Sequence, residues 1–126
     1  MCLGLLMTKA DQFQRRLIEF AARTTRVAKI LPRTVEGRYI AQQLIRSGLA
    51  APPNYAEARA AESRADFIHK LRIVLKELNE TISWLEQIVA NGLLPREKMT
   101  AIIAENQELC WIVGASIKTV RHSISH

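Results

Sequence analysis

Positively charged side chains recur along the first amphipathic segment at a spacing that suits a phosphate backbone. At 100° per residue they fall opposite the apolar residues of a helix, in a stripe about four turns long. The stripe consists of Arg15, Arg16, Arg23, Arg26, Lys29 and Arg33. No aromatic residue interleaves with it, so we expect contacts to phosphates rather than base stacking, with little sequence preference and strong salt dependence. The alternative is a solvated stripe whose charges pair with a neighbouring subunit.

Polar residues in the middle of the chain form a second candidate constellation. A hydrogen-bonded network there would lock the second helix to the third, because an arginine–carboxylate pair is charge-assisted and geometrically strict. The expected members are Arg46, Asn54, Glu57 and Glu80. A ligand pocket is the rival interpretation. If Glu57 has a buried partner, its removal should cost about 3 kcal/mol, because the partner charge is left stranded.

No catalytic or metal signature emerges from the remaining reactive residues. Ser63, Asp66 and His69 follow one another at steps of three on one helix, whereas a triad needs the base to reach the nucleophile directly. Helix capping accounts for the first two, and the histidine is expected at the surface. His122 and His126 are one helical turn apart, but two ligands near a chain end make a poor metal site. We therefore expect no enzyme activity, metal or cofactor.

The two cysteines and the start of the chain bear on its location. Neither the position of Cys2 nor that of Cys110 suggests a disulfide framework, so we expect a reducing, cytoplasmic setting. The apolar run in MCLGLLM is too short for a signal peptide or a membrane span. We expect no membrane partner, and Met7 is an alternative to Met1 as the start of translation.

Charge is unevenly distributed along the 126 residues, which carry a net charge of +6. Residues 1–59 contain 10 Lys/Arg against 4 Asp/Glu, whereas residues 60–126 contain 8 of each. A basic half beside a neutral half favours an anionic partner, with nucleic acid ahead of lipid. A merely arginine-rich soluble surface is the simpler alternative.

The elements that position these residues are predicted to be helices. Apolar residues recur at helical spacing in four segments, about 8–30, 34–61, 63–90 and 95–121. Thr34 and Ser63 are good N-caps, Pro95 suits a first turn, and Asn91-Gly92 suits a helix end. Pro52-Pro53 should kink or briefly break the second helix, because two amide donors are missing there.

Buried rows can also be assigned within these segments. In the last one, Asn106 is the polar residue of an otherwise apolar seam and should fix the helix register. Ile18, Ile30, Trp84 and Trp111 lie off the main rows, which suggests a second packing surface or a subunit contact. Short connections between four amphipathic segments predict an all-α, antiparallel up-down four-helix bundle with a proline-kinked second helix. Residues 1–126 form one domain, with a disordered tail at 1–7 and a frayed tail at 122–126.

Residues 44–85 resemble a known family, and the resemblance extends over roughly residues 10–121. The carrying segments are Leu44-Ile45-Arg46-Ser47-Gly48, Pro53-Asn54-Tyr55-Ala56-Glu57-Ala58 and Ser63-Arg64-Ala65-Asp66-Phe67, followed by Leu71, Leu78, Glu80, Thr81, Trp84 and Leu85. The chain is similar to the four-helix bundle proteins first noticed in intervening sequences of bacterial large-subunit ribosomal RNA genes. It departs from the common family pattern at Ala58, where glycine is frequent, and in its arginine-rich first helix.

The resemblance implies an up-down bundle that assembles into a ring-shaped homopentamer. A relative similar in fold, the accessory variability protein of diversity-generating retroelements, is a basic ring that binds reverse transcriptase and nucleic acid. We therefore expect a non-enzymatic oligomeric scaffold that binds RNA or DNA through its first helix. The alternative is a structural adaptor that binds a partner protein, such as a reverse transcriptase, through its ring surface.

Overall fold

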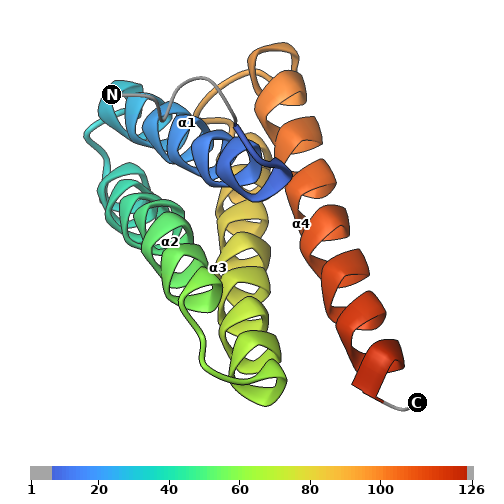
Figure 1. Cartoon of the computed structure of the whole chain (residues 1–126). Helices are drawn as coiled ribbons and strands as arrows, with labels where there is room; N and C mark the ends of the chain where they lie inside the picture. Colours follow the sequence, from blue (N-terminus) through green and yellow to red (C-terminus); the bar gives the residue numbers. More distant parts are fainter. Residues whose placement is uncertain (1–6, 125–126) are drawn as a thin grey trace.

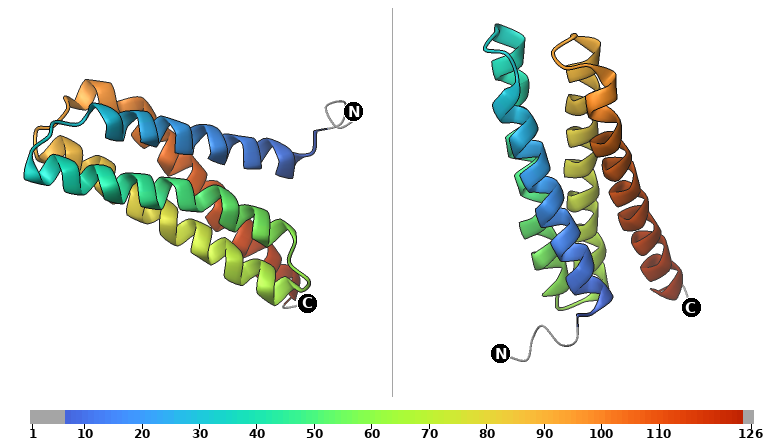
Figure 2. Two further views of the ribbon diagram at one scale, coloured as in Figure 1. Left: turned by 90° about the vertical axis from the view of Figure 1, so that its left-hand side faces the viewer. Right: turned by 90° about the horizontal axis from the view of Figure 1, so that it is seen from above.

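Four antiparallel helices make up the described part of the chain. The computed structural model describes residues 7–124, which contain α1 (Lys9–Ile30), α2 (Val35–Arg59), α3 (Arg64–Ala90) and α4 (Arg96–Ile124) (Figure 1). Each helix runs opposite to the one before it, and helices adjacent in sequence pack side by side (Figure 2). The predicted all-α four-helix fold is confirmed.

Short local signals set the helix boundaries. Thr8 and Asp11 form a capping box at the start of α1, and each backbone amide donates to the other's side chain at 3.0 Å. The side chains of Thr34 and Ser63 cap α2 and α3 as predicted. After α3, Gly92 adopts a φ of +66°, which lets the chain turn back over the last carbonyls of the helix.

The core lies between the apolar faces of all four helices. The largest fully buried apolar side chains come from each of them: Leu17, Phe20, Leu44, Leu71, Val74, Leu78, Leu85, Ile88, Met99, Leu109 and Val113. Asn106 is buried among them, as its place in the seam predicted, and its Nδ2 donates to Leu78 O at 3.0 Å. This hydrogen bond fixes α4 along α3.

Close approaches fix the register of α2 against its two neighbours. Gly48 faces Thr24 of α1 so closely that a Cβ atom at Gly48 would stand 2.3 Å from Thr24 Oγ1. On the other side of α2, Thr81 Oγ1 donates to Ser47 Oγ at 2.8 Å. Glycine therefore lets α1 approach α2, and two buried hydroxyl groups join α2 to α3.

The double proline does not interrupt α2. Pro52 and Pro53 lie within one continuous helix, so the predicted short break is wrong, and the helix ends at Arg59 rather than near residue 61. Packing overrides local preference here: Pro52 is buried, and Gln14 Nε2 of α1 donates to its carbonyl at 2.9 Å. The bend of the helix axis stays a prediction.

The last helix extends close to the end of the described chain. Helix α4 includes residues 122 and 123, and the fraying expected from residue 122 stays a prediction. Arg64 Nη1 at the start of α3 donates to Ser123 Oγ at 2.9 Å, which gives this last turn a partner. Residues 1–6 of the predicted disordered tail, together with residues 125 and 126, lie outside the described residues.

Candidate nucleic-acid interface

The outer face of α1 carries most of the predicted basic stripe. Arg15, Arg26 and Lys29 are exposed, and Arg23 is half-buried toward the side of the helix. Arg33 is exposed in the turn that follows α1. Arg15, Arg26 and Lys29 lie on one side of α1. Arg26 follows Arg15 by eleven residues and Lys29 follows Arg26 by three, and each spacing departs from a whole number of helical turns by less than one-fifth of a turn.

These five cations keep their charges available to a ligand. Within residues 7–124, no salt bridge involves any of them. Glu19 is exposed on the same helix, so the face retains one negative charge among the positive ones. We call Arg15, Arg23, Arg26, Lys29 and Arg33 the α1 basic face.

Arg16 differs from the rest of the predicted stripe because it forms an ion pair with another helix of the bundle. Its Nη2 and Nε donate to the two carboxylate oxygens of Glu105 on α4, at 2.7 and 3.1 Å. The hydrogen bonds that Arg16 donates to Glu105 are the main cause that raises the pKa of Arg16. This bidentate pair ties α1 to α4, so Arg16 is already engaged within the bundle, and its place in the phosphate-binding stripe stays a prediction.

The predicted polar network forms only in part. Arg46 of α2 pairs with Glu80 of α3, as predicted, and also lies 3.4 Å from Glu77 Oε1. The hydrogen bond with Glu80 is the main cause that raises the pKa of Arg46. Sequence reasoning missed Glu77, although its position three residues before Glu80 places both on one helix face.

The other two members of that network lie elsewhere. Asn54 Nδ2 donates to Ala50 O within its own helix, at 2.8 Å. Glu57 is exposed and its carboxylate lies 3.8 Å from Lys70 Nζ. The four residues therefore do not form one network. A large loss of stability on removal of Glu57 required a buried partner charge, and the exposed contact with Lys70 does not meet that condition.

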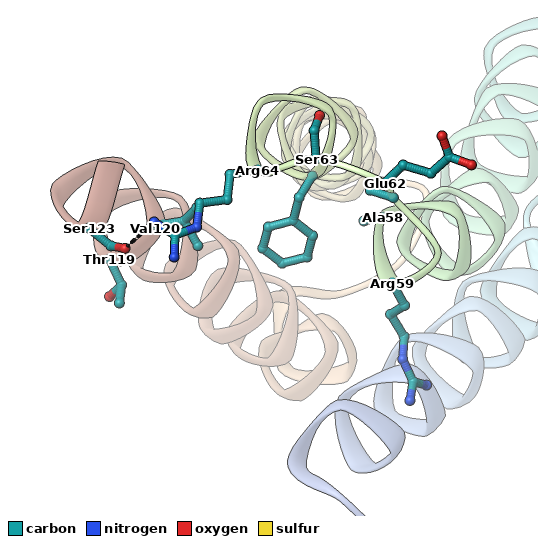
Figure 3. A pocket seen from close by; sticks show the side chains of 10 residues that line it. Ala58, Arg59, Glu62, Ser63, Arg64, Thr119, Val120 and Ser123 are labelled. Atoms are coloured by element: carbon teal, nitrogen blue, oxygen red, sulfur yellow. Dashed lines mark hydrogen bonds between the residues drawn. The ribbon is translucent and has the colours of Figure 1, made fainter. Parts of the chain in front are cut away.

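An open pocket of about 440 Å³ lies where α2 turns into α3 and faces the end of α4 (Figure 3). Its two arginines are already engaged: Arg59 Nη2 lies 2.7 Å from Asp11 Oδ1, and Arg64 bonds Ser123. Ser63 Oγ accepts the backbone amide of Asp66 at 3.0 Å, which confirms its capping role. Both arginines of the pocket and the Ser63 hydroxyl are therefore already engaged in contacts within the bundle.

The remaining reactive residues are dispersed. His69 is exposed on α3, and His126 lies outside the described residues. Burial raises the pKa of the Cys110 thiol, whose Sγ lies 3.5 Å from Asn79 Oδ1. Among residues 7–124, no group of three His, Cys, Asp or Glu side chains is placed to hold a metal ion. Within that same range, no helix is both long enough and apolar enough to cross a membrane.

One surface feature was only partly anticipated from the sequence. The Trp111 side chain is 69% exposed on α4 and lines a groove of about 580 Å³ between α3 and α4. Trp84, by contrast, packs partly against the core, and its ring meets Tyr39 edge-on at a centroid distance of 5.7 Å. Helical spacing placed both tryptophans off the core rows. It did not predict that the Trp111 indole is exposed to solvent whereas the Trp84 indole is partly buried.

The fold and its surface thus define a small all-α bundle with a basic first helix. The chain belongs to the 23S rRNA-intervening sequence protein family, whose sequence profile matches residues 10–115. Its structure is similar to that of a protein of unknown function from the S23 ribosomal protein family of Bacteroides thetaiotaomicron. The two share 36% identity and a TM-score of 0.78, over 84% of this chain and 98% of the other. No functionally curated protein gives a significant match.

Proposed function

We propose that this protein is a non-enzymatic binding module that holds the phosphate backbone of RNA or DNA against the α1 basic face. The observation that carries the proposal is a set of five cations on one helix and the turn after it, none of which forms a salt bridge with another described residue. Unpaired guanidinium and ammonium groups release condensed counterions from a nucleic acid without first breaking an internal salt bridge. The free thiol of Cys110 suits a cytoplasmic location.

We further propose that the protein acts as a ring-shaped homopentamer. Ile18 and Ile30 are 53% and 64% exposed beside the basic face, and a subunit contact would cover them. In a ring, the α1 basic face recurs in every subunit, so weak contacts with one polyanion would add through effective concentration. Binding would then depend strongly on assembly.

The first experiment is gel filtration with light scattering, alone and with a mixed-sequence duplex, at low and high salt. A five-fold mass that shifts with nucleic acid only at low salt is expected. An unchanged five-fold mass at every salt concentration would instead favour the adaptor function, in which the ring surface binds a protein. A monomer would refute the assembly proposal.

Paired variants separate the basic face from net charge. Arg26→Ala with Lys29→Ala removes two charges from α1, and Arg64→Ala with Lys76→Ala removes two from α3, so both proteins fall from +6 to +4. If each α1 cation contacts one phosphate, the slope of log affinity against log salt should drop by about 1.8 in the first variant. An equal loss of affinity in both variants would show that only overall charge matters, and would refute the interface.

A further inference from the structure

The groove between α3 and α4 combines an exposed aromatic ring with an apolar floor. Leu75, the buried Ile117 and the exposed Trp111 are among the residues that line it. Its volume of about 580 Å³ falls in the range of small-ligand sites. We call this surface the α3–α4 groove; the two helices that form it lie side by side in Figure 2.

The space beside the indole is unfilled. Gly114 follows Trp111 by three residues and therefore lies on the same side of α4. A Cβ atom placed on Gly114 would meet no described atom within 4 Å apart from its chain neighbours and the adjacent backbone of α4. The surface of α4 is therefore open at this position, one turn from the indole.

Positive charge surrounds this ring. Arg72 of α3 and Lys118 and Arg121 of α4 line the same groove, and none of its described lining residues is acidic. An adjoining hollow shares Lys118 and continues along α4 to His122. Across the described chain, neither Arg72 nor Lys118 takes part in a salt bridge. Lys118 is two helical turns beyond Trp111, about 10 Å along the axis, so a cation follows the ring along the helix.

We propose that the α3–α4 groove binds an unpaired nucleotide, whose base stacks on Trp111 while its neighbouring phosphates contact Arg72 and Lys118. An aromatic platform flanked by cations is the arrangement that holds single strands, because every base has a π-face and every linkage a charge. This inference rests on the proposed nucleic-acid function and deepens it. The α1 basic face binds backbone alone, whereas the groove distinguishes single strands from duplexes.

Tryptophan fluorescence tests the groove directly. The chain has two tryptophans, so Trp84→Phe leaves Trp111 as the sole reporter. Mixed-sequence single-stranded RNA should quench its emission at low salt, and a blunt duplex of equal charge should not. In anisotropy titrations with a labelled single strand, Trp111→Ala should weaken binding about 5- to 150-fold, the range for loss of one stacked base. Trp111→Phe keeps a ring and should retain most of the affinity.

The outcomes separate this inference from the proposed function. Binding of the duplex that depends on Arg26 and Lys29, with no quenching of Trp111 by a single strand, would overturn the groove and leave the α1 interface standing. Failure of both oligonucleotides to bind would overturn both. Emission that changes on dilution of the protein but not with oligonucleotide would show that a second copy covers the groove. Equal quenching by polyglutamate would point to an acidic protein segment as the occupant, and would also overturn the proposal.

Discussion

Replacement of Gly48 by alanine should test how tightly α1 and α2 are packed. The added methyl carbon would stand 2.3 Å from Thr24 Oγ1 and 3.2 Å from its Cβ. Carbon and oxygen atoms that do not bond lie at least about 3.3 Å apart. Thr24 is fully buried and its hydroxyl already donates to Ala21 O at 2.8 Å, so relief requires either loss of that bond or separation of the helices by about 1 Å.

The magnitude follows from two opposing effects. Overpacking of a well-packed interior costs about 1–3 kcal/mol. Alanine in place of glycine within a helix gains up to about 1 kcal/mol. The free energy of unfolding should therefore fall by about 1–2 kcal/mol, which lowers Tm by roughly 3–8 °C in a domain of this size.

A matched control and a rescue sharpen this test. Gly114→Ala makes the same exchange in α4, where the new methyl meets no described atom within 4 Å outside its own stretch of helix, so it should raise stability by up to about 1 kcal/mol. In the background of Thr24→Ala, which removes the obstructing hydroxyl, Gly48→Ala should cease to destabilise. The coupling energy between these two sites is expected to be about 2 kcal/mol.

Urea unfolding followed by circular dichroism is the assay, at one fixed protein concentration because assembly would add to apparent stability. Opposite shifts for Gly48→Ala and Gly114→Ala are expected. Two outcomes would refute the argument: a change of the free energy of unfolding in the same direction for both variants, or an effect of Gly48→Ala that persists in the Thr24→Ala background. Either would show that the contact between Gly48 and Thr24 does not determine how closely α1 and α2 pack.

Three further predictions concern charged groups. Glu57→Ala should change the free energy of unfolding by no more than about 0.5 kcal/mol, because its contact with Lys70 is exposed; a thermal shift of 10 °C would contradict this. Arg46→Ala should lower the free energy of unfolding by about 1–2 kcal/mol, because the Glu77 side chain, 12% exposed, loses its cation. Glu77→Gln in the Arg46→Ala background should recover part of that loss, because it removes the stranded charge. Asp11 has a pKa lowered to about 2, chiefly by a hydrogen bond from an arginine. Its folded-state pKa lies below the unfolded value near 3.8, so the stabilisation by Asp11 is present above pH 4 and fades from there to pH 2. In Asp11→Asn, the free energy of unfolding should therefore fall less steeply between pH 4 and pH 2, and an unchanged slope would argue against the ion pair.

Helix boundaries and buried rows were accessible from the sequence because they depend on residues close together in the chain. A cap such as Ser63 acts on the amide three residues ahead, and the αL position after α3 needs only Gly92. Periodicity then assigns each buried row, including the polar position at Asn106. These signals are local, so a single chain displays them.

Features that depend on distant partners were not accessible in the same way. A helical wheel places Arg16 with the other cations of α1, and only the packing of α4 against α1 brings Glu105, 89 residues away, into contact with it. Likewise, proline preference predicts a kink or a short break at Pro52-Pro53, whereas α2 is continuous through both prolines and Pro52 is buried against its neighbours. A helical wheel shows on which face of its helix a residue lies. The packing of the other helices determines which side chains contact that residue.

The unequal contacts among the helices have a consequence for how the protein folds. Each helix packs mainly on its neighbours in sequence, whereas α1 and α4 share the smallest contact (Figure 2). Native contacts are therefore formed mostly between segments close along the chain, which lowers contact order and favours folding within microseconds to milliseconds. The same arrangement makes α1 and α4 the natural sites of partial opening, each able to detach while the α2–α3 pair persists. In hydrogen exchange, amides of the two outer helices should lose protection before those of the central pair.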